Sequence, residues 1–147
     1  MKIIIEEIKN IIETEIVVRC QENNEEVGKI VASLRLFDQT IIGKKDANKH
    51  ILTLGEIGYF EGVDDKVFCY TDKDVYETSY RLYEVEEAFR SAGFVRVNKN
   101  TVLNANLIKS FKSSLNGRME AMLDNGDRIE VSRSYVIPLK SLLGGKK

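Results

Sequence analysis

Residues 93–104 read GFVRVNKNTVLN and residues 130–135 read EVSRSY, and between them lie two Asn-Gly pairs, at 116–117 and 125–126. Asn-Gly is the strongest short-range signal for a β-hairpin, because both residues tolerate a positive φ angle. Apolar residues at every second position from Met119 predict one buried face and one wetter face. The pattern therefore predicts a three-stranded meander, with strands at residues 107–111, 118–123 and 128–131.

A final helix is expected after residue 131. Ser132 and Ser134 can cap its first turn, and Pro138 is tolerated only in a first helical turn, because proline lacks a backbone N–H group. Gly144 is expected to end the helix and to begin a tail over residues 144–147, of which Lys146 and Lys147 are expected to fray. The apolar side of this helix consists of Leu139, Leu142 and Leu143.

The segment before residue 93 is expected to be mostly β, with a single helix. Apolar residues recur at helical spacing from Leu82 to Phe89, Thr78 and Ser79 offer capping hydroxyls nearby, and Gly93 can adopt the left-handed conformation that ends a helix. The strands are predicted at residues 57–61, 67–71 and 75–77.

The first third of the chain alternates between strand and helix patterns. Residues 3–5 and 15–19 are rich in β-branched residues and predict strands, and residues 40–42 predict a third. Asn23 or Asn24 can cap a helix between them. Its apolar stripe, which predicts core packing or a dimer interface, consists of Val27, Ile30, Val31, Leu34 and Phe37.

A boundary is predicted at residues 43–48, where Gly, Lys, Asp and Asn residues cluster. We therefore divide the chain into an N-terminal α/β extension over residues 1–45, a main domain over residues 46–143 and the tail. The length of 147 residues suits one domain with a short extension.

The composition argues against a membrane or secreted protein and against a metal site. No segment approaches the roughly 18 apolar residues of a membrane-spanning helix, so we expect a cytoplasmic protein without membrane insertion. Cys20 and Cys69 have neither disulfide nor zinc spacing, and we interpret both as small core residues. His50 is the only histidine, and we interpret it as a solvated loop residue. We therefore expect no cofactor, no metal and no enzymatic activity.

The net charge of −1 is the sum of two segments of unequal length that carry opposite net charges. Residues 1–94 carry 12 Lys and Arg against 19 Asp and Glu, whereas residues 95–147 carry 10 against 4. The first segment therefore has a net charge of −7 and the second of +6. A basic portion of this kind suggests a surface that meets an anionic partner, such as a nucleic acid.

The quoted stretches resemble the LytTR DNA-binding domain family. The family pattern runs F-x-R-x-H-[RK]-S-[YF]-[LIV]-V-N, continues through Asn-Gly turns and closes on V-S-R-x-Y, and residues 59–61 resemble its Y-[FI]-E strand. The resemblance covers residues 46–143 in the same order. Asn98, Asn100 and Thr101 depart from the family, which usually has histidine, serine and an aromatic residue there.

The resemblance implies elongated antiparallel sheets, mostly β with short helices, that present loops to successive major grooves of double-stranded DNA. It implies contacts from Lys66, Lys99 and Arg133, with Asn98, Asn100 and Ser132 beside them. A guanidinium matches the O6 and N7 atoms of guanine, lysine acts as a point charge, and asparagine can pair with adenine. Candidate phosphate contacts are Arg96, Lys109, Lys112 and Arg118.

We therefore expect a sequence-specific transcriptional regulator that binds promoter repeats, as a homodimer at least on DNA. It is response-regulator-like but without a receiver domain, since residues 1–45 are too few for one. The alternative is a protein interaction module of LytTR-like fold that has lost DNA binding, which the departures at residues 98–101 motivate.

Overall fold

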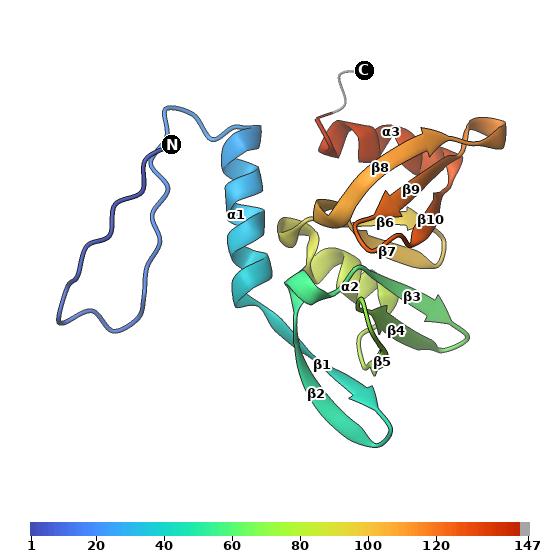
Figure 1. Cartoon of the computed structure of the whole chain (residues 1–147), viewed down its shortest axis with the longest axis horizontal. Helices are drawn as coiled ribbons and strands as arrows, with labels where there is room; N and C mark the ends of the chain where they lie inside the picture. Colours follow the sequence, from blue (N-terminus) through green and yellow to red (C-terminus); the bar gives the residue numbers. More distant parts are fainter. Residues whose placement is uncertain (145–147) are drawn as a thin grey trace.

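The computed structural model describes residues 1–144 and is mostly β, with three α-helices in this range (Figure 1). The helices are α1 (Glu25–Asp38), α2 (Leu82–Ala88) and α3 (Arg133–Leu142). The strands of the first half are β1 (Thr40–Lys45), β2 (Asn48–Thr53), β3 (Tyr59–Val63), β4 (Lys66–Tyr70) and β5 (Val75–Thr78). The strands of the second half are β6 (Phe94–Asn98), β7 (Thr101–Asn104), β8 (Ile108–Ser113), β9 (Met119–Leu123) and β10 (Arg128–Val131).

The strands form two antiparallel sheets. The larger sheet has the order β2-β1-β5-β4-β3-β7-β6, and the smaller has the order β10-β9-β8. The smaller sheet is the meander predicted from the Asn-Gly pairs, and Met119, Ala121 and Leu123 form its buried face as expected. The predicted fold class, mostly β with short helices and antiparallel sheets, is therefore confirmed.

Two hydrophobic clusters hold the sheets and helices together. The first lies under α2, where the Phe60 and Phe94 rings meet at a centroid distance of 5.6 Å. The second joins the small sheet to β6, β7 and α3 through residues such as Val97, Leu103 and Leu139. Because β6 contributes Phe94 to the first cluster and Val97 to the second, this strand fixes the two sheets relative to each other.

The N-terminal segment follows the prediction in its helix and in the strand predicted at residues 40–42, which lies within β1. Asn24 caps α1, since its Oδ1 accepts a hydrogen bond from the Val27 N–H at 3.2 Å. Phe37 was expected in the apolar stripe but is 83% exposed, and Leu36 packs against the first cluster instead. The strands predicted at residues 3–5 and 15–19 are wrong, because these β-branched segments find no partner strand.

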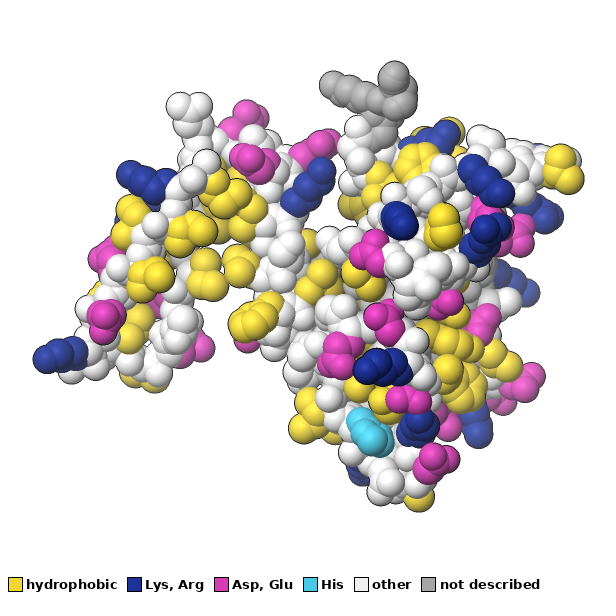
Figure 2. Space-filling model, viewed as in Figure 1, with side chains coloured by type: hydrophobic (Ala, Val, Ile, Leu, Met, Phe, Trp, Pro, Cys, Tyr) yellow, Lys and Arg dark blue, Asp and Glu magenta, His cyan; other side chains and the backbone are white. Residues whose placement is uncertain are grey.

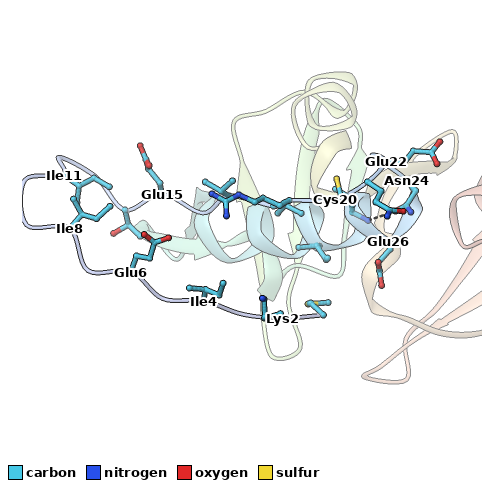
Figure 3. Close-up of a pocket in the computed structure, with 18 of the residues that line it drawn as sticks. Lys2, Ile4, Glu6, Ile8, Ile11, Glu15, Cys20, Glu22, Asn24 and Glu26 are labelled. Carbon is cyan, nitrogen blue, oxygen red and sulfur yellow. Dashed lines mark hydrogen bonds between the residues drawn. The ribbon is translucent and has the colours of Figure 1, made fainter.

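Residues 1–24 form two arms beside α1. The arm that carries Ile4 and Glu6 turns at Ile8 and Ile11 into the arm that carries Glu15, and both line a cleft against α1 (Figure 3). Their isoleucines are largely exposed.

The hairpin of β1 and β2 crosses residue 46, at which we placed the start of the main domain. Asp46 and Ala47 form its turn with positive φ angles of 51° and 68°. Ile41 belongs to the first cluster, and Lys45 forms an ion pair with Asp74 that raises the pKa of the lysine and lowers that of the carboxylate. Residues 40–45 are thus continuous with the large sheet, while the predicted division into domains stays a prediction.

Two features of the helices differ from the prediction, and two glycines agree with it. α2 is not capped by Thr78 or Ser79; the Arg81 N–H instead donates to the Glu84 carboxylate at 2.8 Å. Pro138 lies in the interior of α3 rather than in its first turn, at an exposed position. Gly93 and Gly144 have the predicted left-handed conformation, and the rest of the predicted tail lies outside the described residues.

Two single-residue predictions are wrong. Cys69 is fully buried as expected, but Cys20 is exposed. His50 lies half-buried on β2, not in a loop, and its ring lies 5.2 Å from that of Tyr76. Within residues 1–144 no helix has the length and apolar character needed to cross a membrane.

Candidate nucleic-acid interface

The β3–β4 and β6–β7 turns lie side by side at one end of the large sheet. β3 pairs with β7, so that Glu61 faces Thr101, and the Gly62 N–H donates a hydrogen bond to the Asn100 carbonyl at 2.8 Å. The turn between Val63 and Lys66 is therefore adjacent to the turn formed by Lys99 and Asn100.

The junction between β10 and α3 reaches the same end of the molecule from the small sheet. The Ser132 N–H donates to the Val97 carbonyl at 2.9 Å, and Asn98 Nδ2 donates to the Glu130 carbonyl at 2.9 Å. Arg133 follows directly as the first residue of α3. Lys99 and Arg133 thus belong to neighbouring segments, although 33 positions separate them in the sequence.

The β8–β9 loop completes this end. A Cβ atom on Gly117 would lie 2.9 Å from Cδ of Arg133, so the arginine side chain passes directly over this glycine. We call residues 63–66, 98–101, 114–118 and 131–134 together the contact edge; all four segments lie on the right of the view in Figure 1. The Asn-Gly pattern predicts Gly117 only as a turn residue and gives no sign of its packing against Arg133.

The three cations that the family resemblance singles out are exposed. Neither Arg133 nor Lys99 forms an ion pair with another described residue. Lys66 Nζ lies 3.9 Å from Glu77 Oε1, at the outer limit for an ion pair, and its side chain is largely exposed. These three head groups are therefore available to an external anion.

Most of the candidate phosphate contacts have a carboxylate partner. Arg118 Nη1 lies 2.9 Å from Glu130 Oε2, and Lys112 Nζ lies 3.7 Å from Glu120 Oε1. Lys109 is exposed. Figure 2 shows Lys and Arg side chains interspersed with acidic side chains on this part of the surface. Cross-strand partners of this kind could not be predicted before the register of the small sheet was known.

Arg96, the fourth candidate phosphate contact, is held inside the protein. Its Nε and Nη2 atoms lie 3.2 and 3.1 Å from Glu86 Oε1 on α2, and its Nη1 donates to the Lys99 carbonyl at 2.7 Å. The side chain is 17% exposed. All its nitrogen atoms thus have a partner within the chain.

The three polar residues beside the cations differ in availability. Asn98 uses both ends of its amide, since Nδ2 donates to the Glu130 carbonyl and Oδ1 accepts from the Asn100 N–H at 2.9 Å. The Asn100 side chain is exposed. Ser132 is the N-cap residue of α3, but its hydroxyl makes no capping hydrogen bond, contrary to the expected role of the serines.

A tyrosine pair stiffens the hairpin that carries Lys66. Tyr59 and Tyr70 stack with ring centroids 4.3 Å apart, and the Tyr70 hydroxyl donates to Glu61 Oε1 at 2.7 Å. Burial and this hydrogen bond both raise the pKa of Tyr70. Within the described part of the chain, no group of three His, Cys, Asp or Glu residues has the arrangement of a metal site.

Comparison with known proteins gives a consistent result. The family model described as "LytTr DNA-binding domain" matches residues 47–144. A solved LytTr DNA-binding domain of a putative methyl-accepting/DNA response regulator from Bacillus cereus superposes with a TM-score of 0.68. That match covers 73% of this chain and 98% of the other at 24% identity, and shows a shared fold.

Three relatives align with the sequence. The sensory transduction protein LytT of Bacillus anthracis is 30% identical over 93 residues, which are 63% of this chain and 38% of LytT. LytT of Enterococcus faecalis is 28% identical over 58% of this chain and 36% of its own length. The chain thus spans little more than a third of these two relatives. An uncharacterized HTH-type transcriptional regulator of Staphylococcus aureus is 24% identical over 133 residues, 89% of this chain and 90% of the relative.

Proposed function

The chain belongs to the LytTR DNA-binding domain family, and on that premise we propose that it is a sequence-specific transcriptional regulator whose contact edge enters successive major grooves of double-stranded DNA. The observation that carries this proposal is that exposed cations from three separate segments share one edge of the molecule. The hydrogen bonds from Gly62 to Asn100 and from Ser132 to Val97 hold these segments together.

We assign the main base contact to Arg133. Its planar guanidinium has no internal carboxylate partner among the described residues and can donate two hydrogen bonds to guanine. Lys99 and Lys66 approach guanine acceptors or phosphates as point charges, and the exposed Asn100 amide suits adenine. Asn98 receives no base contact in this proposal, because its amide is already bonded within the chain.

Contacts with the phosphates of the DNA backbone surround these base contacts. Ser132 and the first N–H groups of α3 face the contact edge, and the N-terminal end of a helix dipole favours a phosphate. Lys109 is available directly, whereas Lys112 and Arg118 exchange Glu120 and Glu130 for phosphate oxygens. Such contacts release counterions, so the affinity depends steeply on salt.

We further propose that two copies bind repeated half-sites in promoters as a homodimer. The N-terminal arms and α1 lie away from the contact edge (Figure 1), and the apolar residues of the arms and Phe37 of α1 are exposed. Exposed apolar surface of this extent is characteristic of an interaction site. Because the proposed ligand is chromosomal DNA, we place the protein in the cytoplasm, without enzymatic activity.

Selection of bound fragments from a random pool of duplexes tests this function. The proposal predicts enrichment of one motif, with affinity that falls as salt rises. Enrichment of no motif, together with binding that is absent or insensitive to salt, would contradict it and would favour the protein interaction module.

A further inference from the structure

We propose that Asn98 is a positioning residue that joins the Lys99 turn to the Arg133 junction, so that the two approach DNA as one rigid unit. The proposal rests on the DNA-binding function inferred above and assigns Asn98 a part in it that is not a DNA contact. Three sets of internal contacts carry it.

The two hydrogen bonds of the Asn98 amide reach in different directions. Oδ1 accepts from the Asn100 N–H at 2.9 Å, which closes the β6–β7 turn around Lys99. Nδ2 donates to the Glu130 carbonyl at 2.9 Å, 32 residues further along the chain. A single side chain therefore sets the shape of the turn and also attaches it to β10.

The attachment occurs where two different sheets meet. β6 is the last strand of the large sheet and β10 the first of the small sheet. The Ser132 N–H bonds to the Val97 carbonyl one residue away, so Asn98 adds a side-chain bond to this backbone bond. A register shift between Arg96 and Asn98 marks a bulge, a feature that re-aims side chains and here accompanies a fully buried Val97.

Arg96 supports the opposite side of the same turn. It spans from Glu86 on α2 to the Lys99 carbonyl, to which its Nη1 donates at 2.7 Å. Arg96 thus holds the Lys99 carbonyl and connects it to α2, and the Asn98 side chain holds the Asn100 N–H on the other side of Lys99. Because the backbone of this turn is fixed from both sides, less conformational entropy is lost when the Lys99 turn binds a ligand.

Two neutral substitutions separate the bonds of Asn98. Asn98→Ala removes both of them. Asn98→Ser retains a hydroxyl that can accept from the Asn100 N–H, as serine does in turns, but is too short to reach the Glu130 carbonyl. Asn125→Ala is the matched control, because Asn125 Oδ1 also accepts from a backbone N–H two residues on, that of Asp127 at 2.9 Å, outside the contact edge.

The first measurement is amide hydrogen exchange in the full chain without DNA. In Asn98→Ala we expect faster exchange at both Asn100 and Ser132. In Asn98→Ser we expect faster exchange at Ser132 only. Unchanged exchange at Ser132 in Asn98→Ala would overturn the attachment, whatever the protein binds.

The second measurement is affinity for a duplex selected by the unaltered protein, at several salt concentrations. We expect Asn98→Ala to bind about tenfold more weakly, the equivalent of one hydrogen bond. Its salt dependence should be unchanged, because no charge is lost. Asn98→Ser should lose most of the same affinity, and Asn125→Ala none. Normal affinity in Asn98→Ala would contradict the positioning role alone, whereas failure of the unaltered protein to select a duplex would contradict the proposed function.

Discussion

The place of Arg133 in the backbone leaves its side chain open to an external ligand. As the first residue of α3 it is exposed, and its side chain passes over Gly117, where a larger residue would obstruct it. Arg96 and Arg118 carry the same charge but are each paired with a glutamate. Because desolvating an arginine that already has a partner adds a cost to binding, we expect Arg133 to contribute more to base discrimination than either of them.

Substitution of Arg133 should change sequence preference more than overall affinity for DNA. Arg133→Ala removes a bidentate contact and should lower discrimination at one base pair by about 1 to 3 kcal/mol. Lys112→Ala should weaken binding to all duplexes alike and reduce the salt slope by about 0.9. Competition binding with duplexes that differ at single positions measures both effects. The same uniform loss in the two variants would refute the assignment.

The two thiols should differ in reactivity and in their effect on stability. Burial raises the pKa of Cys69 from 9.0 to about 11, whereas Cys20 is exposed. A thiol reagent at neutral pH should therefore modify one cysteine in the folded protein and two after unfolding. Modification of both in the folded protein would show that Cys69 is accessible.

The raised pKa of Cys69 also predicts a loss of stability in alkali. The folded chain retains the Cys69 proton up to about pH 11, whereas the unfolded chain loses it near pH 9. The contribution of this protonated thiol to the unfolding free energy is therefore complete below pH 9 and is lost as the pH rises through 11. Between pH 8 and pH 10 the wild type should lose about 1 kcal/mol more unfolding free energy than Cys69→Val. Equal losses in urea titrations would contradict this.

At the scale of elements, local turn signals predicted more of the fold than strand propensity did. Asn116 and Gly117 have positive φ angles of 62° and 76°, and the meander they predicted is present. The β-branched residues 15–19 predicted a strand that does not form, because pairing depends on a partner that propensity does not supply.

The candidate site could be predicted in part. The order of motifs identified Lys66, Lys99 and Arg133, which the fold brings to one edge. It could not show that the Asn98 and Arg96 side chains are bonded within the chain, because their partners, Glu130 and Glu86, lie in other elements. Such partners become known only once the packing of the sheets is known.

Gly117 in the β8–β9 turn and Gly126 in the β9–β10 turn offer a matched pair of substitutions. Gly117→Ala and Gly126→Ala both place alanine at a left-handed φ, of 76° and 95°, so each should lower the unfolding free energy by about 1 to 2 kcal/mol. The Cβ added at Gly117 meets the Arg133 side chain, whereas a Cβ added at Gly126 meets no atom within 4 Å beyond its chain neighbours. DNA affinity should therefore fall in Gly117→Ala and be retained in Gly126→Ala. Equal DNA affinities, measured where both variants are folded, would exclude a role for this packing.

The proposed DNA-binding surface and the proposed dimerisation surface lie in different parts of the molecule. The basic half of the chain supplies most of the contact edge, and the more acidic N-terminal half supplies the arms and α1 (Figure 1). Such a division lets one part meet DNA while another meets a second copy.

Self-association should depend on the N-terminal apolar residues. Phe37→Asp should shift a dimer toward monomer in sedimentation equilibrium, because it places a charge in the proposed interface. Leu115→Asp is the control, since Leu115 is similarly exposed, at 81% against 83% for Phe37, but lies on the contact edge. A monomeric wild type, or an unchanged dimer in Phe37→Asp, would contradict the homodimer.

The most direct test of the contact edge is an NMR titration of the full chain with a selected duplex, followed through its backbone amide signals. We predict that the largest shifts fall in residues 63–66, 98–101 and 131–134 together, while the β1–β2 turn at Asp46 and Ala47 is unaffected. Shifts confined to α1 and the N-terminal arms, or to only one of the three segments, would contradict a shared DNA-binding edge.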